Sequence, residues 1–330
     1  MSWKGIRAGA FRASWGMALS LVLTAAGAQA QTAAKFKVLA FGPMSGDQGH
    51  DSYIHEANKW FPKMAAQYGF QYDSTKNWGD CNTAKLAQYK VVIFFDNRPN
   101  DAAQRDAFKA YMDNGGGWIG SHFAAFALNG SAVTQNWNWY HNDFLGSGEY
   151  VSNTWRPTSA FLKVEDQQSV FTQGLGSLFK ASPNEWYKWK NDLKTKADIK
   201  ILCSIDPTSF PLGTGPKTYE IWHEGYYPVV WTNTKYKMLY LNMGHNDIDY
   251  EGGTNKDLSQ TFANETQNKL ILNAMLSFAG VPSPVLANPA RGAARAAFTR
   301  ASTTPVFGAI AGPAHDARGR SLPTSSAPTR

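Results

Sequence analysis

Two nearly continuous apolar runs limit what this chain can fold into more than any other feature. They read FKVLAFG at residues 36–42 and KVVIFFD at residues 90–96. Strands with so few polar positions are typical of a sheet that is covered on both faces. Between them, residues 51–69 carry apolar side chains at helical spacing and end on Gly69, a common helix stop. The order strand, helix, strand predicts parallel strands joined by a crossover helix.

The same alternation of strand and helix continues to about residue 280. A helix is predicted after residue 100, where Asn100 or Asp101 can cap its first turn and three glycines follow its end. The other predicted elements are strands at 118–121, 198–205, 228–233 and 237–244 and a closing helix at 268–280. Because crossovers between parallel strands are right-handed, the predicted fold class is α/β, with a doubly wound, mostly parallel sheet and helices on both faces. Aromatic-rich loops at residues 129–232 are predicted to be insertions above that sheet.

The two ends of the chain differ from this body. Residues 1–30 begin with three basic residues, continue with an apolar stretch at 15–26 and finish on Ala-Gln-Ala, which predicts a secretory signal peptide. An anchor helix is disfavoured because the apolar stretch is too short to span a bilayer. Residues 281–330 are rich in Pro, Ala and Arg and predict a disordered tail. We therefore expect one α/β domain at 31–280, in a periplasmic or secreted protein with no integral membrane segment after signal cleavage.

The basic net charge of +7 lies in those ends and not in the domain. Three of the 32 basic residues are in the leader and six are in the tail, together with one of the 25 acidic residues, which leaves 23 basic and 24 acidic residues in between. A near-neutral domain gives no support for nucleic-acid binding. The two cysteines, Cys81 and Cys203, could form a disulfide in an exported protein or occupy separate positions, and their spacing does not decide between these.

Three histidines follow predicted strands directly. His50 comes after the first strand, His122 after the strand at 118–121 and His245 after the strand at 237–244. In open α/β sheets, ligands bind beyond the carboxyl ends of the strands, so these side chains are expected at one edge. A single histidine in such a position is more often a hydrogen-bonded structural residue, but three together favour a functional site. The carboxylates at 96–106 are interpreted instead as caps and solvated groups of the following helix.

The motifs in this order resemble one known family. They are GHDS at 49–52, NGGGWIGSHFAA at 114–125, WNWY at 137–140, NEWY at 184–187 and LNMGH at 241–245. Taken together over residues 36–280, they resemble the ThuA-like (trehalose utilisation) family. The resemblance implies a flavodoxin-like fold similar to that of class I glutamine amidotransferases.

The resemblance also bears on the corner after the strand at 118–121. Amidotransferases have G-x-C-x-G there, with the cysteine as nucleophile at a strained turn. This chain has Gly-Ser-His-Phe-Ala at 120–124, so His122 replaces the cysteine. Because an imidazole cannot form the acyl-thiol intermediate, the chain is predicted not to be a glutamine amidotransferase.

The family resemblance assigns the remaining site residues by position. It implies His122, Glu185, His50 and His245 as catalytic residues and Ser52, Trp139, Tyr140, Trp186 and Tyr187 as substrate-binding residues. Asn184 stands where the family has an aspartate before Glu185, which weakens a mechanism with paired acids. His50, His122 and His245 could also hold a divalent metal such as zinc, with Glu185 or Asp247 as a carboxylate.

The aromatic content of the inserted loops points to sugars as ligands. Flat aromatic faces pack against the C–H faces of sugar rings, although about half of these side chains are expected to form core under the loops instead. The residues concerned are Trp137, Trp139, Tyr140, Trp155, Trp186, Tyr187, Trp189, Trp222, Tyr226 and Tyr227.

Three functions therefore remain open. The favoured one is an exported carbohydrate-active enzyme, a hydrolase or lyase acting on a disaccharide or keto-sugar by histidine and glutamate proton transfer. The others are a carbohydrate-binding protein without catalysis and a surface scaffold with a vestigial cleft.

Overall fold

The computed structural model describes residues 34–128, 136–154, 157–209, 225–245 and 260–282. The chain divides into two units, Met1–Ala34 and Lys35–Arg330, and the fold below is that of the second. The predicted signal peptide at 1–30 and nearly all of the predicted tail at 281–330 lie outside the described residues. Within the described part, no helix combines the length and the apolar character that crossing a bilayer requires.

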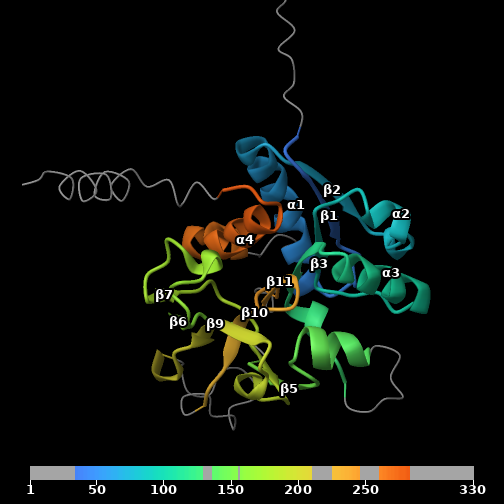
Figure 1. The fold of residues 1–330 in the computed structure, drawn as a ribbon. Coiled ribbons are helices and arrows are strands. Elements are labelled where there is room, and N and C mark those ends of the chain that lie inside the picture. Colours follow the sequence, from blue (N-terminus) through green and yellow to red (C-terminus); the bar gives the residue numbers. More distant parts are fainter. Residues whose placement is uncertain (1–33, 129–135, 155–156, 210–224, 246–259, 283–330) are drawn as a thin grey trace, which may run out of the picture. The chain divides into compact units, whose positions relative to one another are not determined.

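The unit is built on a nine-stranded sheet with the strand order β2-β1-β3-β4-β11-β10-β9-β6-β7 (Figure 1). Its first half is parallel and consists of β2 (Gln71–Thr75), β1 (Lys37–Phe41), β3 (Val91–Phe95), β4 (Gly117–Ser121) and β11 (Lys237–Leu241). Its second half is antiparallel and consists of β10 (Pro228–Asn233), β9 (Ile199–Ile205), β6 (Phe161–Val164) and β7 (Leu178–Lys180). The predicted fold class, a doubly wound sheet with parallel core strands, is confirmed.

The antiparallel half corrects one detail of the sequence prediction. The strands predicted at 198–205 and 228–233 are present as β9 and β10, but the rest of residues 129–232, expected to lie above the sheet, adds two further strands, β6 and β7, to its edge. Only three residues separate β10 from β11, and so short a connection can join antiparallel strands but not parallel ones. The rest of this region includes a π-helical turn at Trp139–Phe144 and a separate two-stranded sheet of β5 (Tyr150–Asn153) and β8 (Tyr187–Trp189).

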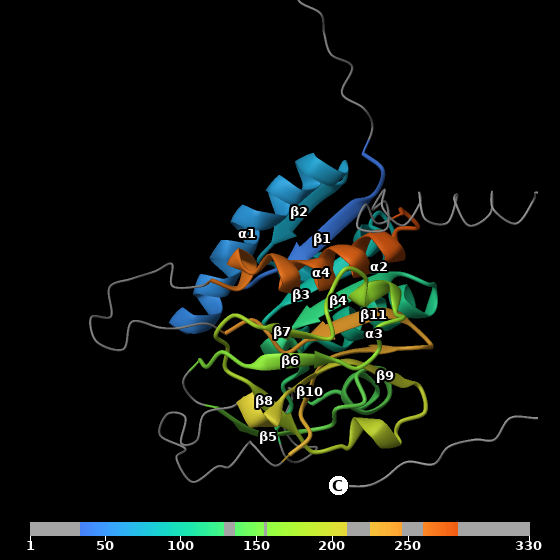
Figure 2. The same cartoon turned by 90° about the vertical axis from the view of Figure 1, so that its left-hand side faces the viewer.

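Helices cover both faces of the parallel half (Figure 2). One face is packed by α1 (Gln48–Tyr68) and α4 (Glu265–Phe278), and the other by α2 (Thr83–Leu86) and α3 (Ala102–Asp113). In β3, alternate side chains enter the two cores: Val91, Ile93 and Phe95 one, Val92 and Phe94 the other. Burial on both faces is the physical reason for the continuous apolar runs in the sequence.

The two cysteines lie in opposite cores and are free thiols. Cys81 packs on the α3 face and Cys203 on the α1 and α4 face, so the sheet separates them. Burial raises the pKa of Cys81 to about 12 and raises the pKa of Cys203 as well, which makes both unreactive. Of the two arrangements that the sequence left open, the structure has the separate positions.

Candidate functional site

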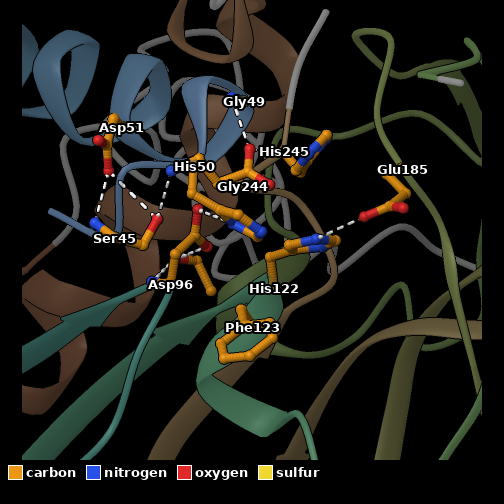
Figure 3. Close-up of polar contacts among 12 residues, drawn as sticks. Ser45, Gly49, His50, Asp51, Asp96, His122, Phe123, Glu185, Gly244 and His245 are labelled. Atoms are coloured by element: carbon orange, nitrogen blue, oxygen red, sulfur yellow. Dashed lines mark hydrogen bonds and ion pairs between the residues drawn. The ribbon is translucent and has the colours of Figure 1, made fainter. Parts of the chain in front are cut away.

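The carboxyl edge of the parallel half brings the three predicted histidines together (Figure 3). His50 lies in the first turn of α1, His122 follows β4 and His245 lies four residues beyond the end of β11. Their ring centroids are 5.3 Å apart for His50 and His122, 4.6 Å for His50 and His245, and 5.6 Å for His122 and His245. We call these three residues the strand-end histidines.

A buried carboxylate orients the first of them. Asp96, directly after β3, places Oδ2 3.1 Å from Nδ1 of His50. Burial raises the pKa of Asp96 well above its usual value and lowers the pKa of His50, so the surroundings disfavour a charge on either group. The interpretation of the acidic residues at 96–106 as helix caps is correct for Asp101, which caps α3, but wrong for Asp96. The missed signal was its position immediately after a fully apolar strand.

His122 occupies the corner after β4 and contacts Glu185. Its Nε2 lies 3.3 Å from Oε2 of Glu185, and the ring of Tyr187 lies against it with a centroid distance of 3.9 Å. The backbone of His122 has φ 43°, so the strained turn that the amidotransferase comparison implies is present. Burial lowers the pKa of His122 well below its usual value, and the neighbouring His50 and His245 act in the same direction. The imidazole is therefore neutral.

Asn184 connects Glu185 to the end of β11. Its side-chain oxygen accepts the backbone N–H groups of Gly244 at 2.9 Å and His245 at 3.3 Å. Its side-chain nitrogen donates to the carbonyl oxygens of Glu185 at 3.0 Å and Asn242 at 2.5 Å. A carboxylate could make the first two contacts but not the last two. The Asn184 amide therefore makes all four of these contacts, and an aspartate, which the family resemblance implies at this position, could not make them all.

A second carboxylate, Asp47, joins the site from the start of α1. Its Oδ1 lies 3.6 Å from Nε2 of His245 and also accepts the N–H of Gly49 as the helix cap. The nearby His245 imidazole lowers the pKa of Asp47, which stays ionised. Ligand atoms of Asp47, His50 and His245 all lie within 4.8 Å of one another. His122 lies outside that group, although the sequence placed it in the candidate metal set.

Two glycines allow these side chains to come so close. A methyl group on Gly49 would overlap the ring of His245, and one on Gly244 would overlap Asp96 and His122. Sequence reasoning did not single out Asp47 and quoted Gly49 only within the GHDS motif, although both lie with His50 at the start of α1. Asp247, the other carboxylate that the sequence offered, lies outside the described residues.

Most of the predicted substrate-binding residues lie in the interior. Ser52 is buried in α1, and Trp139 stacks on Phe144 with a centroid distance of 5.1 Å. Tyr140 is fully buried and donates its hydroxyl to Ala124 O at 3.0 Å. Trp186 is also fully buried and donates its indole N–H to Thr158 O at 2.6 Å. Of the five, Tyr187 is the one that the structure places against a strand-end histidine.

Two cavities open next to this region. One, of about 360 Å³, is lined by residues that include Tyr187, Trp189 and Tyr226. The other, of about 390 Å³, is lined largely by amide side chains and Trp137. Lys190 and Asn191 line both cavities, and Tyr187 connects the first to His122. Amides and aromatic faces together suit a ligand rich in hydroxyl groups.

The fold and the corner after β4 define the class of protein. The parallel half of the sheet is covered on both faces, and a residue with strained backbone, His122, follows its central strand β4, as the family resemblance in the sequence implies. The profile of the ThuA family, described as trehalose utilisation, matches residues 37–264. The chain belongs to this family.

One solved structure supports that assignment, and others are more remote matches. A ThuA-like protein from Bacteroides uniformis ATCC 8492 is 33% identical, with a TM-score of 0.65, and the match covers 75% of this chain and 92% of that one. A ThuA-like protein from Parabacteroides merdae ATCC 43184 is 16% identical, with a TM-score of 0.51 and coverage of 75% and 91%, and shows the shared fold. The glutaminase domain of Trypanosoma brucei CTPS, with bound acivicin, matches at 10% identity and a TM-score of 0.42, covering 75% and 95%. No curated protein matches the chain.

Proposed function

We propose that this protein is a carbohydrate-active enzyme that acts on a disaccharide or a keto-sugar derivative by proton transfer between the substrate and the pair His122 and Glu185. The observation that carries the proposal is the 3.3 Å contact between these two side chains at the corner after β4. The family description, trehalose utilisation, supports a disaccharide as the substrate class. The composition of residues 1–30 supports a site of action in the periplasm or outside the cell.

The pair provides the groups that such reactions need. Hydrolysis of a glycosidic bond requires one group that protonates the leaving oxygen and one that activates water. Elimination from a keto-sugar requires a base for the acidic C–H beside the carbonyl and an acid for the leaving oxygen. In both cases one acid and one base must lie within a few ångströms of the same bond. Asn184 fixes Glu185 for this role by tying its backbone to the end of β11.

Tyr187 gives the substrate a place next to that pair. Its ring packs on His122, and the residue is also one of those that line the 360 Å³ cavity, together with Trp189 and Tyr226. A sugar ring seated on these aromatic faces would lie beside the reacting groups. His122 is fully buried, so the proposal requires the substrate to displace side chains that cover it.

Turnover assays with matched variants test the proposal. Trehalose, other disaccharides and their keto derivatives would be incubated with the purified protein, and the products would be followed by chromatography and mass spectrometry. Asparagine tolerates positive φ, so His122→Asn keeps the strained turn while it removes the imidazole. We expect His122→Asn and Glu185→Gln to reduce turnover by about 10²–10⁴-fold.

The control is His55→Ala, which removes an exposed histidine of α1 that is not one of the strand-end histidines. This variant should keep full turnover. Retained turnover in both site variants would remove His122 and Glu185 as the reacting pair. Sugar binding without turnover in the unmodified protein would favour the carbohydrate-binding function instead.

A further inference from the structure

We propose that Asp47, His50 and His245 bind a divalent transition-metal cation, and that Asp96 is the positioning residue behind His50. The proposal deepens the proposed function, on which any catalytic use of the ion rests, but binding can be measured without a sugar. It differs from the metal set that the sequence favoured, because Asp47 takes the place of His122.

The distances between the ligand atoms suit a cation of this kind. Bonds of 2.0–2.2 Å in a tetrahedral site place neighbouring ligand atoms about 3.4 Å apart. His245 Nε2 and Asp47 Oδ1 are already 3.6 Å apart, and the full set lies within 4.8 Å. Small side-chain rotations would therefore close the three atoms around one ion.

His50 has the orientation of a metal ligand. When its Nδ1 carries the proton and donates to Asp96 Oδ2, the lone pair of Nε2 is available on the opposite side of the ring. A carboxylate behind a ligating imidazole is a common arrangement in metal sites, because it fixes both the tautomer and the ring orientation. Asp96 has φ 48°, so the backbone is strained at the residue that holds His50 in place.

The contact between His245 and Asp47 requires a proton or a cation between the two side chains. An unprotonated Nε2 and the ionised Asp47 oxygen both present lone pairs, and at 3.6 Å they repel each other unless a proton or a cation lies between them. The other ring nitrogen, Nδ1, is buried and has no hydrogen-bond partner among the described residues. The alternative to a metal is a proton on His245 Nε2 that points toward Asp47, and the experiment below separates the two.

The donor set limits the choice of ion. Two imidazole nitrogens and one carboxylate oxygen suit Zn²⁺, Fe²⁺ or Mn²⁺, whereas Ca²⁺ and Mg²⁺ prefer oxygen ligands throughout. Three protein ligands leave an open coordination position, which is typical of catalytic metal sites and not of structural ones. His122 lies beside this group of ligands, with its ring centroid 5.3 Å from that of His50. An ion here would hold a substrate oxygen beside the proposed acid and base.

Titration of the untagged, chelator-treated protein with Zn²⁺ tests the site. We expect calorimetry and elemental analysis to give one ion per chain, and Co²⁺ to give the visible absorption bands of a site with imidazole ligands. His50→Gln and His245→Gln should lose this binding, and Asp96→Asn should weaken it by about 10–100-fold. His55→Ala, on the exposed side of α1, should bind as the unmodified protein does.

Two results would overturn the proposal. One is the absence of stoichiometric binding by the unmodified protein, which would leave a proton on His245 Nε2 as the explanation of its contact with Asp47. The other is unchanged binding in both His50→Gln and His245→Gln after circular dichroism has shown that they are folded. Metal binding without turnover of any sugar would contradict the proposed function alone, and turnover that survives chelation would contradict the catalytic use of the ion alone.

Discussion

The strand-end histidines and the inserted aromatics, Trp137, Trp139, Tyr140 and Trp186, differ in how well their polar atoms are satisfied. Tyr140 and Trp186 donate to backbone carbonyls and are fully buried. By contrast, ring nitrogens of His122 and His245 are buried without a hydrogen-bond partner among the described residues. The sequence predicted that both groups would contact a ligand. Tyr140 and Trp186 therefore build the core, whereas His122 and His245 each keep a ring nitrogen that no described residue satisfies.

The backbone shows the same contrast. Asp96 and His122, which surround the histidine cluster, are the two non-glycine residues with positive φ that the described part of the chain contains. Such conformations cost roughly 1–3 kcal/mol each and persist where the surroundings enforce them. Strain and unsatisfied nitrogens at one edge of the sheet are therefore consistent with a functional site there.

The largest expected effect concerns Trp186, which the sequence assigned to substrate binding. Because the structure buries the ring completely, Trp186→Ala should lower the free energy of unfolding by about 3–5 kcal/mol. Denaturant unfolding, followed by circular dichroism, measures this loss directly.

Tyr226 provides the matched control for that experiment. It lines the 360 Å³ cavity and is 37% exposed, so Tyr226→Ala should change stability by less than about 1 kcal/mol. If Trp186→Ala weakened sugar binding and left stability intact, the inserted aromatics would have to be regarded as a binding surface after all.

Much of the fold could be predicted because burial leaves a clear mark on the sequence. The runs at 36–42 and 90–96 are apolar at every position that faces either core, and Gly69 and Asp101 end and begin helices as expected. The antiparallel half was not recognised as such, because strand direction depends on connections and not on the composition of the strands themselves. In the long aromatic region, β9 and β10 were predicted close to their observed bounds, but nothing in the sequence indicated the shorter strands β5, β6, β7 and β8.

The candidate site was predicted only in part. In open α/β sheets, ligands bind beyond the carboxyl ends of the strands, and this rule placed His50, His122 and His245 correctly at one edge because it depends on topology alone. It would have found Asp96 as well, had that residue not been assigned to a helix cap. Asp47 could not be found in this way, because its contact with His245 depends on how closely α1 approaches the end of β11.

An intermediate effect is expected from His141, a histidine that lies among the inserted aromatics and not at the strand ends. Its Nδ1 accepts the backbone N–H of Trp137 at 3.0 Å. Burial lowers its pKa to about 3, and the positive charges of Arg98 and Arg105 act in the same direction. The folded protein therefore keeps His141 neutral, while the unfolded chain takes up a proton below about pH 6.5.

The sign of the pH effect follows from this difference. Stability that depends on neutral His141 is complete above pH 6.5 and is lost as the pH falls toward 3, by about 2 kcal/mol at pH 5. In His141→Gln this part of the acid sensitivity should disappear, so the stability difference between the two proteins should shrink by that amount between pH 7.5 and pH 5. A constant difference over this range would show that His141 is not held neutral.

The smallest expected effects come from replacing Gly49 and Gly69, the glycines at the two ends of α1. Gly69, at the C-terminal end, has φ 74°, and a methyl group there would make only ordinary van der Waals contact with the Lys35 side chain, so Gly69→Ala should cost about 1 kcal/mol of stability through backbone strain. Gly49, in the first turn, lies against the His245 ring, and a methyl group there would displace that ring. Gly49→Ala should therefore weaken Zn²⁺ binding at least about tenfold, as expected when a metal ligand loses its orientation. Because alanine favours the helix by up to about 1 kcal/mol relative to glycine, the stability of this variant should change little.

Calorimetric titration with Zn²⁺ measures the binding of the ion by both variants, and thermal unfolding measures their stability. Equal Zn²⁺ binding by Gly49→Ala and Gly69→Ala would show that cation binding does not depend on how the His245 ring packs against the start of α1. The close approach of helix and imidazole would then be only a packing feature.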